Sequence, residues 1–182
     1  MNYIILSDDT WTWKEAINSI FTSNFMQEVD INGEQRIDCI FGDITGELQQ
    51  NEHTNRDGRD RIPLIKGLLE TGGIKLALLA INEDILYQES PTFREKLLGL
   101  FSKSNYWFEI RGTCLQAFGV DSTKFQYFIL IHEKSIPNPF IFNFDLGLTF
   151  EKNINNDNDD INNYININLL KLLMNKIKER LF

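Results

Sequence analysis

Residues 62–81 carry the clearest structural signal in the chain, and they read Ile-Pro-Leu-Ile-Lys-Gly-Leu-Leu-Glu-Thr-Gly-Gly-Ile-Lys-Leu-Ala-Leu-Leu-Ala-Ile. The spacing over residues 62–71 predicts a helix with Pro63 in its first turn, where the missing N–H costs little. A glycine pair at 72–73 then ends the helix. Residues 74–81 are almost continuously apolar, which is typical of a central parallel strand covered on both faces. Helix and strand together predict an α/β fold.

The sequence before this helix also alternates strand and helix patterns. Residues 3–6 are an apolar strand pattern, and residues 7–10 read as a turn that caps the helix pattern of residues 11–25. A second short apolar run, residues 37–41, is predicted to be a buried strand that ends at Gly42. Both strands precede the central strand in an α/β order.

The sequence after the central strand predicts a different connection. An amphipathic helix is expected over residues 91–101, followed by strands over residues 106–110 and 125–131. The segment between these strands, residues 113–123, contains no obvious helix of crossover length. We therefore expect the two strands to pair antiparallel.

The composition divides the chain into three parts. Residues 1–150 are expected to form one α/β domain, and residues 151–168 read as an asparagine- and aspartate-rich linker of low complexity. Residues 169–182 predict an amphipathic helix whose cations lie toward its C-terminus, where they suit the helix dipole. This helix either docks on its own domain or binds a partner from the end of a tether.

Charge and composition exclude several classes of protein. The chain has 182 residues, of which 42% are hydrophobic and 24% charged, so it is not globally disordered. With 18 basic and 26 acidic residues the net charge is −8, which argues against nucleic-acid binding over the whole surface. No apolar run approaches the roughly 20 residues of a membrane helix, and residues 1–9 do not resemble a signal peptide. We therefore expect a cytoplasmic protein without membrane contact.

Cysteine and histidine give no sign of a disulfide framework or a metal site. Cys39 and Cys114 lie in apolar stretches, which indicates buried thiols in a reducing compartment. His53 and His132 are isolated in the sequence from each other and from the cysteines. Because zinc sites need clustered ligands, we predict no metal.

The polar segment 43–61 is longer than most connections, and long loops are often functional. It carries three arginines, Arg56, Arg59 and Arg61, among acidic residues. Two interpretations are open. The segment is an ordinary solvated loop, or its arginines contact nucleic-acid phosphates without the help of a basic domain.

Four aromatic residues are candidate anchors of a protein interface, where Trp and Tyr are enriched. They are Trp11, Trp13, Tyr106 and Trp107. The alternative for each is an ordinary core position, because aromatic side chains are mostly buried.

Three parts of the chain resemble the C-terminal half of class I S-adenosylmethionine-dependent methyltransferases. Residues 37–43 resemble the strand that leads into the catalytic tetrapeptide of that family, and residues 65–79 resemble the helix, paired glycines and strand that follow. The third part resembles the closing helix and antiparallel strand pair, and consists of residues 93–98, 118–120 and 128–135. The chain looks most similar to the DNA adenine methyltransferases of restriction-modification and related defence systems.

The resemblance implies a Rossmann-like methyltransferase sheet, mostly parallel with an antiparallel strand pair at one end, to which the C-terminal helix is added. It puts Asp43 where the family has the first residue of its catalytic tetrapeptide, which accepts a hydrogen bond from the amino group of a flipped base. Here the tetrapeptide reads Asp43-Ile44-Thr45-Gly46, without the two prolines and the aromatic residue of the family.

The family binds its cofactor at a glycine-rich turn after the first strand, and the corresponding turn is missing here. Gly33 is the only glycine before residue 37. Asp8 and Asp9 end the first strand, and they either cap the following helix or hold the ribose of S-adenosylmethionine. Because a turn without glycine does not bring backbone N–H groups close to the cofactor in the usual way, no cofactor is expected.

Two functions follow from the resemblance and its departures. The first is a non-catalytic methyltransferase-like module, a subunit or accessory protein of a DNA-modification or defence complex, which binds a protein partner with or without nucleic acid. The alternative is an active S-adenosylmethionine-dependent nucleic-acid methyltransferase completed by a partner chain, with Asp43 catalytic and with Asp8 or Asp9 on the cofactor. A third hypothesis, a hydrolase that holds Mg²⁺ between these aspartates, lacks the aspartate spacing expected of a phosphatase.

Overall fold

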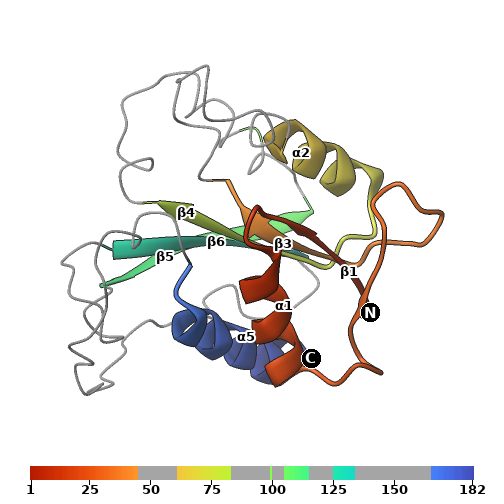
Figure 1. Cartoon of the computed structure of the whole chain (residues 1–182). Coiled ribbons are helices and arrows are strands. Elements are labelled where there is room, and N and C mark those ends of the chain that lie inside the picture. Colours follow the sequence, from red (N-terminus) through yellow and green to blue (C-terminus); the bar gives the residue numbers. More distant parts are fainter. Residues whose placement is uncertain (45–60, 83–98, 100–104, 115–124, 134–164) are drawn as a thin grey trace.

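The computed structural model describes residues 1–44, 61–82, 99, 105–114, 125–133 and 165–182 (Figure 1). The strands and helices along the chain are β1 (Asn2–Leu6), α1 (Thr10–Ile20), β2 (Gln27–Glu28), β3 (Cys39–Asp43), α2 (Arg61–Thr71), β4 (Leu76–Asn82), β5 (Tyr106–Cys114), β6 (Phe125–Glu133) and α5 (Ile167–Leu181). The helix predicted over residues 91–101 lies outside the described residues, apart from the helical Gly99. Residues 151–164 of the predicted linker lie outside them as well.

The six strands of the described residues form one sheet, in the order β2-β1-β3-β4-β6-β5. The strands β2, β1, β3 and β4 are parallel, and β6 is antiparallel to both β4 and β5. In the parallel part Leu6 lies opposite Gly42, and Asp43 lies opposite Ala80. The predicted mostly parallel sheet with an antiparallel strand pair at one end is therefore confirmed.

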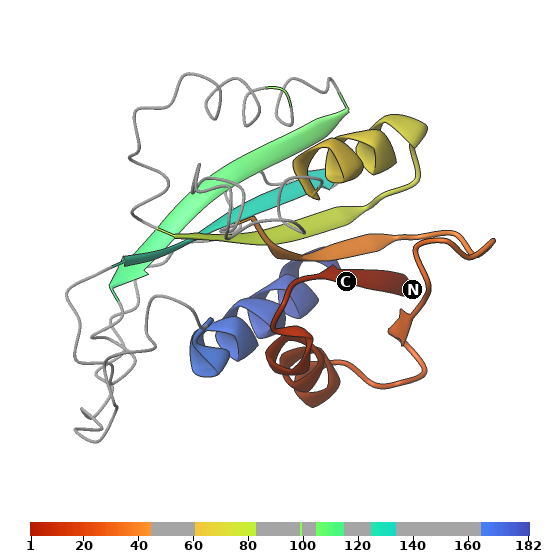
Figure 2. The ribbon, with the colours of Figure 1, turned by 45° about the horizontal axis from the view of Figure 1, so that its top comes forward.

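Helices cover both faces of the sheet, with α1 and α5 on one face and α2 on the other (Figures 1 and 2). Successive residues of the central strand β4 point to opposite faces. The core beneath α1 and α5 takes Leu76, Leu78 and Ala80, and the core beneath α2 takes Ala77, Leu79 and Ile81. None of these six is more than 1% exposed, which confirms the prediction of a central strand buried on both faces.

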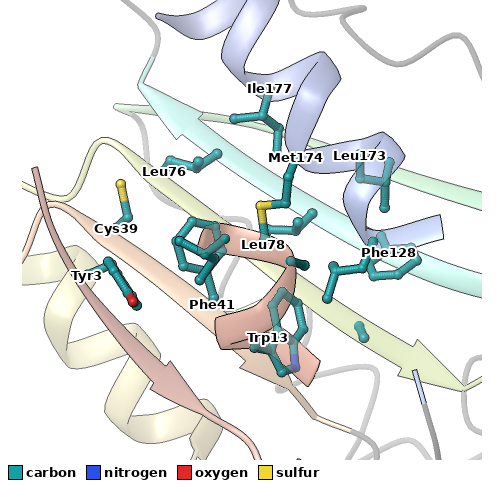
Figure 3. Close-up of a cluster of buried hydrophobic side chains, with 14 of the residues drawn as sticks. Tyr3, Trp13, Cys39, Phe41, Leu76, Leu78, Phe128, Leu173, Met174 and Ile177 are labelled. Carbon is teal, nitrogen blue, oxygen red and sulfur yellow. The ribbon is translucent and has the colours of Figure 1, made fainter. Parts of the chain in front are cut away.

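Large side chains fill the core between the sheet, α1 and α5 (Figure 3). The ring centroid of Phe41 on β3 lies 5.8 Å from that of Tyr3 on β1 and 6.1 Å from that of Trp13 on α1. Trp13 is fully buried. Since a buried aromatic ring contributes more packing area than any aliphatic side chain, these contacts tie α1 to the middle of the parallel strands.

The C-terminal helix α5 docks on the sheet and on α1. Asn166 caps it, because its side chain accepts hydrogen bonds from the backbone N–H groups of Asn168 and Leu169. Lys178 Nζ donates to the carbonyl oxygen of Ile20 at 3.0 Å. The buried face of α5 consists of five side chains with 0% exposure, Leu169, Leu170, Leu173, Met174 and Ile177. Of the two interpretations of this helix, docking on its own domain is the one that the structure shows.

Two predicted boundaries are wrong. Helix α1 ends at Ile20 and not near residue 25, because Phe21 is extended and its ring packs against Phe25 and Phe182. Gly42 lies inside β3 and does not end it. A side-chain carbon on Gly42 would lie 2.8 Å from the carbonyl carbon of Leu6 and would collide with its oxygen, so glycine lets β3 pass close to β1.

The described part of the chain contains no group of three or more acidic, histidine or cysteine side chains that could hold a metal ion. Cys39 is fully buried, and burial raises the pKa of its thiol to about 12, so the thiol stays protonated and unreactive. Of the helices in these same residues, none is long and apolar enough to cross a membrane.

His132 on β6 is fully buried, and its Nδ1 lies 3.2 Å from the carbonyl oxygen of Glu133. Burial lowers the pKa of His132 below its usual 6.5, against a smaller opposing contribution from that carbonyl. As the pH falls below 6.5, the imidazole of His132 therefore becomes protonated in the unfolded chain while it stays neutral in the folded chain. The contribution of neutral His132 to stability is complete above that pH and is lost below it.

We expect the free energy of unfolding to fall more steeply in wild type than in His132→Leu when the pH is lowered from about 7.5 to about 5.5. Urea unfolding at several pH values measures both slopes, and the comparison removes the contribution of carboxylates that titrate in both proteins. If the free energy of unfolding changed equally with pH in wild type and in His132→Leu, His132 would be charged, or in contact with water, in the folded state.

Candidate functional site at the carboxyl edge of the parallel strands

The carboxyl ends of β1 and β3 lie side by side where the connections of the sheet change direction. From β1 the chain passes through α1 to β2 on one side, and from β3 it passes to α2 and β4 on the other. Helices α1 and α2 lie on opposite faces (Figure 1). This is the topological switch point of the sheet, and open α/β sheets bind their ligands beyond the carboxyl ends of the strands at such a point.

Four side chains meet at this point, and we call them the edge cluster: Ser7, Asp8, Asp43 and Arg61. Asp43 is the last residue of β3, and Ser7 and Asp8 follow β1 directly. Arg61 is the first residue of α2. Asp43 and Arg61 are buried, with exposures of 8% and 7%, whereas the side chain of Asp8 is 84% exposed.

Arg61 bridges the two strand ends with the two terminal nitrogens of its guanidinium. Its Nη1 donates to Oδ1 of Asp43 at 2.9 Å and to the carbonyl oxygen of Asp43 at 3.2 Å. Its Nη2 donates to Oδ1 of Asp8 at 2.7 Å. A guanidinium suits this position because its planar donors serve several acceptors in fixed directions. The partners of Arg61 lie 18 and 53 residues away in sequence.

The turn after β1 uses its own side chains to bind its backbone. Ser7 Oγ donates to Oδ2 of Asp43 and accepts a hydrogen bond from the backbone N–H of Asp9 at 3.0 Å. Asp9 caps α1, because its Oδ1 accepts a hydrogen bond from the backbone N–H of Thr12 at 3.2 Å. Of the two roles considered for Asp9, the structure shows the cap.

The structure brings together four of the residues singled out in the sequence. Asp8, Asp9 and Asp43 lie at one edge of the sheet, as strand ends predict, and Arg61 joins them. Arg61 was considered as a phosphate contact, and that contact stays a prediction; in the structure Arg61 forms a buried ion pair with Asp43 and a partly exposed one with Asp8. The other two arginines considered for that contact, Arg56 and Arg59, lie outside the described residues.

Sequence reasoning missed Ser7 and the pairing of Arg61 with Asp43. The available signal for Ser7 was its position directly after a strand that runs beside β3. Of the four aromatic candidates, Trp11 and Trp107 are exposed at 69% and 41%, whereas Trp13 and Tyr106 are buried. Trp11 lies in the first turn of α1, two residues beyond Asp9.

No protein-family model and no curated protein sequence matches this chain. Among solved structures, the chain is similar to a protein named as a prophage-encoded DNA modification methyltransferase from E. coli. The identity is 15% and the TM-score 0.53, over 74% of this chain and 47% of that one. The DNMT2 protein of Spodoptera frugiperda is 14% identical with a TM-score of 0.45, over 77% of this chain and 52% of that one. The Entamoeba histolytica methyltransferase EhMeth is 14% identical with a TM-score of 0.44, over 76% and 54%.

The match to the prophage-encoded protein supports a fold assignment. The chain shares the fold of that protein. It spans about half the length of the solved structures that it matches. The expected Rossmann-like methyltransferase fold is therefore confirmed. The narrower resemblance to adenine methyltransferases stays a prediction, because likeness of fold carries no activity.

Proposed function

We propose that this chain is a methyltransferase-like module that works by binding and does not transfer methyl groups. In this proposal it serves as a subunit or accessory protein of a DNA-modification or defence complex. The observation that carries the proposal is the internal pairing of Asp43, the residue at the position of the catalytic tetrapeptide.

The hydrogen-bond acceptors of Asp43 already have donors from the protein. Arg61 donates to Oδ1 and to the backbone carbonyl oxygen, and Ser7 donates to Oδ2. In methyltransferases of this type the side-chain oxygen and the backbone carbonyl that follows it accept from the amino group of a base, and here it is the side-chain oxygens that are already bound. Freeing the Asp43 acceptors would break a buried ion pair, and leaving one buried charge without its partner is costly. The pairing therefore supports a structural role for Asp43.

The residues at the β1–α1 turn do not fit S-adenosylmethionine. A cofactor that approaches this turn needs free backbone N–H groups and the space that glycine leaves. Here the N–H of Asp9 is bound by Ser7 and that of Thr12 by Asp9. Asp8 and Asp9 also put two carboxylates beside the N-terminus of α1, where they repel the carboxylate of the cofactor. These contacts favour a module without a cofactor.

One observation favours the alternative, an active nucleic-acid methyltransferase completed by a partner chain. Asp43, Asp8 and Asp9 lie at the switch point, where a ligand of this fold would bind. In this alternative a partner or substrate displaces Arg61, Asp43 accepts from the target amino group, and Asp8 or Asp9 contacts the cofactor.

Calorimetric titration with S-adenosylmethionine and S-adenosylhomocysteine distinguishes the two. We expect no heat of binding at millimolar concentrations of either ligand, because the turn lacks glycine and the N–H groups of Asp9 and Thr12 already have acceptors within the protein. Micromolar binding to wild type would contradict the proposal. Methyl transfer to nucleic acid by the chain with its co-purified partner, abolished in Asp43→Ala, would establish the alternative.

A further inference from the structure

Helix α1 buries one face against the sheet and leaves the other in water. Trp11, Glu15, Asn18 and Ser19 are exposed, and their spacing puts them on one side of the helix. Figure 2 shows this side of α1 at the margin of the described structure. Trp11 is the most exposed of the large hydrophobic side chains in the described residues, at 69%. Because tryptophan is enriched among the anchors of protein interfaces, this face of α1 is a candidate docking surface.

Two carboxylates flank Trp11. Glu15 lies one helical turn further along α1, so its Cβ is about 5–6 Å from that of Trp11. The side chain of Glu15 is exposed and forms no ion pair with the described residues. Asp8 precedes Trp11 by three residues, and Arg61 binds only its Oδ1. An exposed indole ring is therefore bracketed by two carboxylates that still have oxygens to offer to a donor.

The charge around this face is negative. Residues 1–44, which build β1, α1, β2 and β3, contain eight acidic and two basic residues. Both basic residues are already paired, Lys14 with Glu28 at 3.0 Å and Arg36 with Asp38 at 3.3 Å. Such a surface repels the phosphates of nucleic acids and of anionic lipids, and it attracts cations. Charge complementarity therefore selects a basic protein as the partner of this face.

An arginine fits the three side chains better than a lysine does. Its planar guanidinium stacks on an indole ring, which is the most favourable aromatic face for a cation. The donors at the edge of the same guanidinium can then bind a carboxylate beside the ring. With Glu15 on one side of Trp11 and Asp8 on the other, the face offers acceptors to more than one arginine. The partner segment is therefore expected to be rich in arginine.

We propose that Trp11, together with Asp8 and Glu15, binds an arginine-rich segment of a protein partner. This inference rests on the proposed function, a module that works by binding a protein, and it names the binding surface and the chemistry of the partner. Binding at this surface leaves the buried ion pair between Asp43 and Arg61 in place.

The first test measures the binding of fluorescein-labelled oligoarginine to the full chain by fluorescence anisotropy. The salt concentration is about 150 mM, where the Debye length of about 8 Å screens distant charges. Oligoarginine should bind, and oligolysine of the same length should bind at least about threefold more weakly, because an ammonium group does not stack on the indole as a guanidinium does. Equal affinities for the two peptides would overturn the stacking on Trp11.

The second test uses variants at exposed positions, where substitution leaves the fold intact. Trp11→Ala and Glu15→Lys should each weaken the binding of oligoarginine at least about tenfold, as expected at an interface anchor. The matched control is Glu34→Lys, which changes the net charge equally. Glu34 is exposed in a turn whose Ile31 and Ile37 pack against the core beneath α2, on the face opposite α1. We expect less than about a threefold loss there, because salt screens the distant charge. Equal losses from the two lysine variants would mean attraction by net charge alone and would contradict a site on α1.

The third test locates the peptide and identifies the class of partner. In a proton–nitrogen NMR spectrum, the indole signal that disappears in Trp11→Phe should shift when oligoarginine is added, and an unmoved signal would refute the proposal. Binding of single-stranded DNA that Trp11→Ala abolishes would make the partner a nucleic acid and would refute it as well. Failure of the proposed function has a separate signature, the binding of S-adenosylmethionine to wild type, which does not depend on Trp11→Ala or Glu15→Lys.

Discussion

Arg61→Met should lower the free energy of unfolding by about 3–5 kcal/mol. The side chains of Arg61 and Asp43 are 8% and 10% exposed, so water does not replace the lost cation. Asp43 would keep its buried charge and lose two of its donors, one to Oδ1 and one to its carbonyl oxygen. Urea unfolding of wild type and variant at neutral pH measures the difference.

The matched control is Arg36→Met. Arg36 also pairs with an aspartate, at 3.3 Å from Asp38, but its side chain is 65% exposed. We expect a loss of less than about 1 kcal/mol there, because exposed ion pairs contribute little. The double variant Asp43→Leu with Arg61→Met should recover part of the loss, because no unpaired charge then remains buried. A loss below about 1 kcal/mol in Arg61→Met would mean that water reaches Asp43, and it would weaken the case for a structural role.

Gly42→Ala should cost about 3 kcal/mol, at the upper end of the range for overpacking. The added methyl group would lie 2.8 Å from the carbonyl carbon of Leu6, and it would meet backbone, which has no rotamer to change. Strands β1 and β3 would have to move apart at the point where Ser7 reaches Asp43. Chemical unfolding measures the loss of stability.

The matched control for this variant is Gly67→Ala in α2. Among the described residues, and leaving aside the two neighbours of Gly67 and the backbone of α2, no atom lies within 4 Å of a side-chain carbon at Gly67. Alanine there should stabilise the protein by about 0.5–1 kcal/mol, because glycine is a poor helix former. Equal effects from the two substitutions would contradict the close approach of β1 and β3.

Local patterns predicted much of the fold because local forces decide it. An apolar run such as residues 74–81 has to be covered on both faces, and strand β4 is indeed buried on both of them. The short link between the last two strands predicted an antiparallel pair, and β5 does pair antiparallel with β6. The candidate site was predicted in part, because residues at the ends of neighbouring parallel strands gather at one edge. Asp8 and Asp43 were found in this way.

The partners of those residues could not be read from the sequence. Arg61 followed a polar segment and had the same local context as Arg56 and Arg59. Its pairing with Asp43 and Asp8 depends on how α2 returns to the sheet, across 18 and 53 residues of chain. Trp11 and Trp13 likewise lie about half a helical turn apart on α1. Only the packing of the helix against Phe41 leaves the first exposed and the second buried.

The sequence by itself determined that the chain has an α/β sheet with a central strand buried on both faces, and that no glycine follows the first strand before Gly33. Only the tertiary structure decided that Asp43 is held in a buried ion pair and that the C-terminal helix covers the core beside α1. The physical reason is the range of the interactions. Periodicity, capping and turn preferences act between residues a few positions apart, whereas an ion pair or a docked helix depends on where distant segments meet.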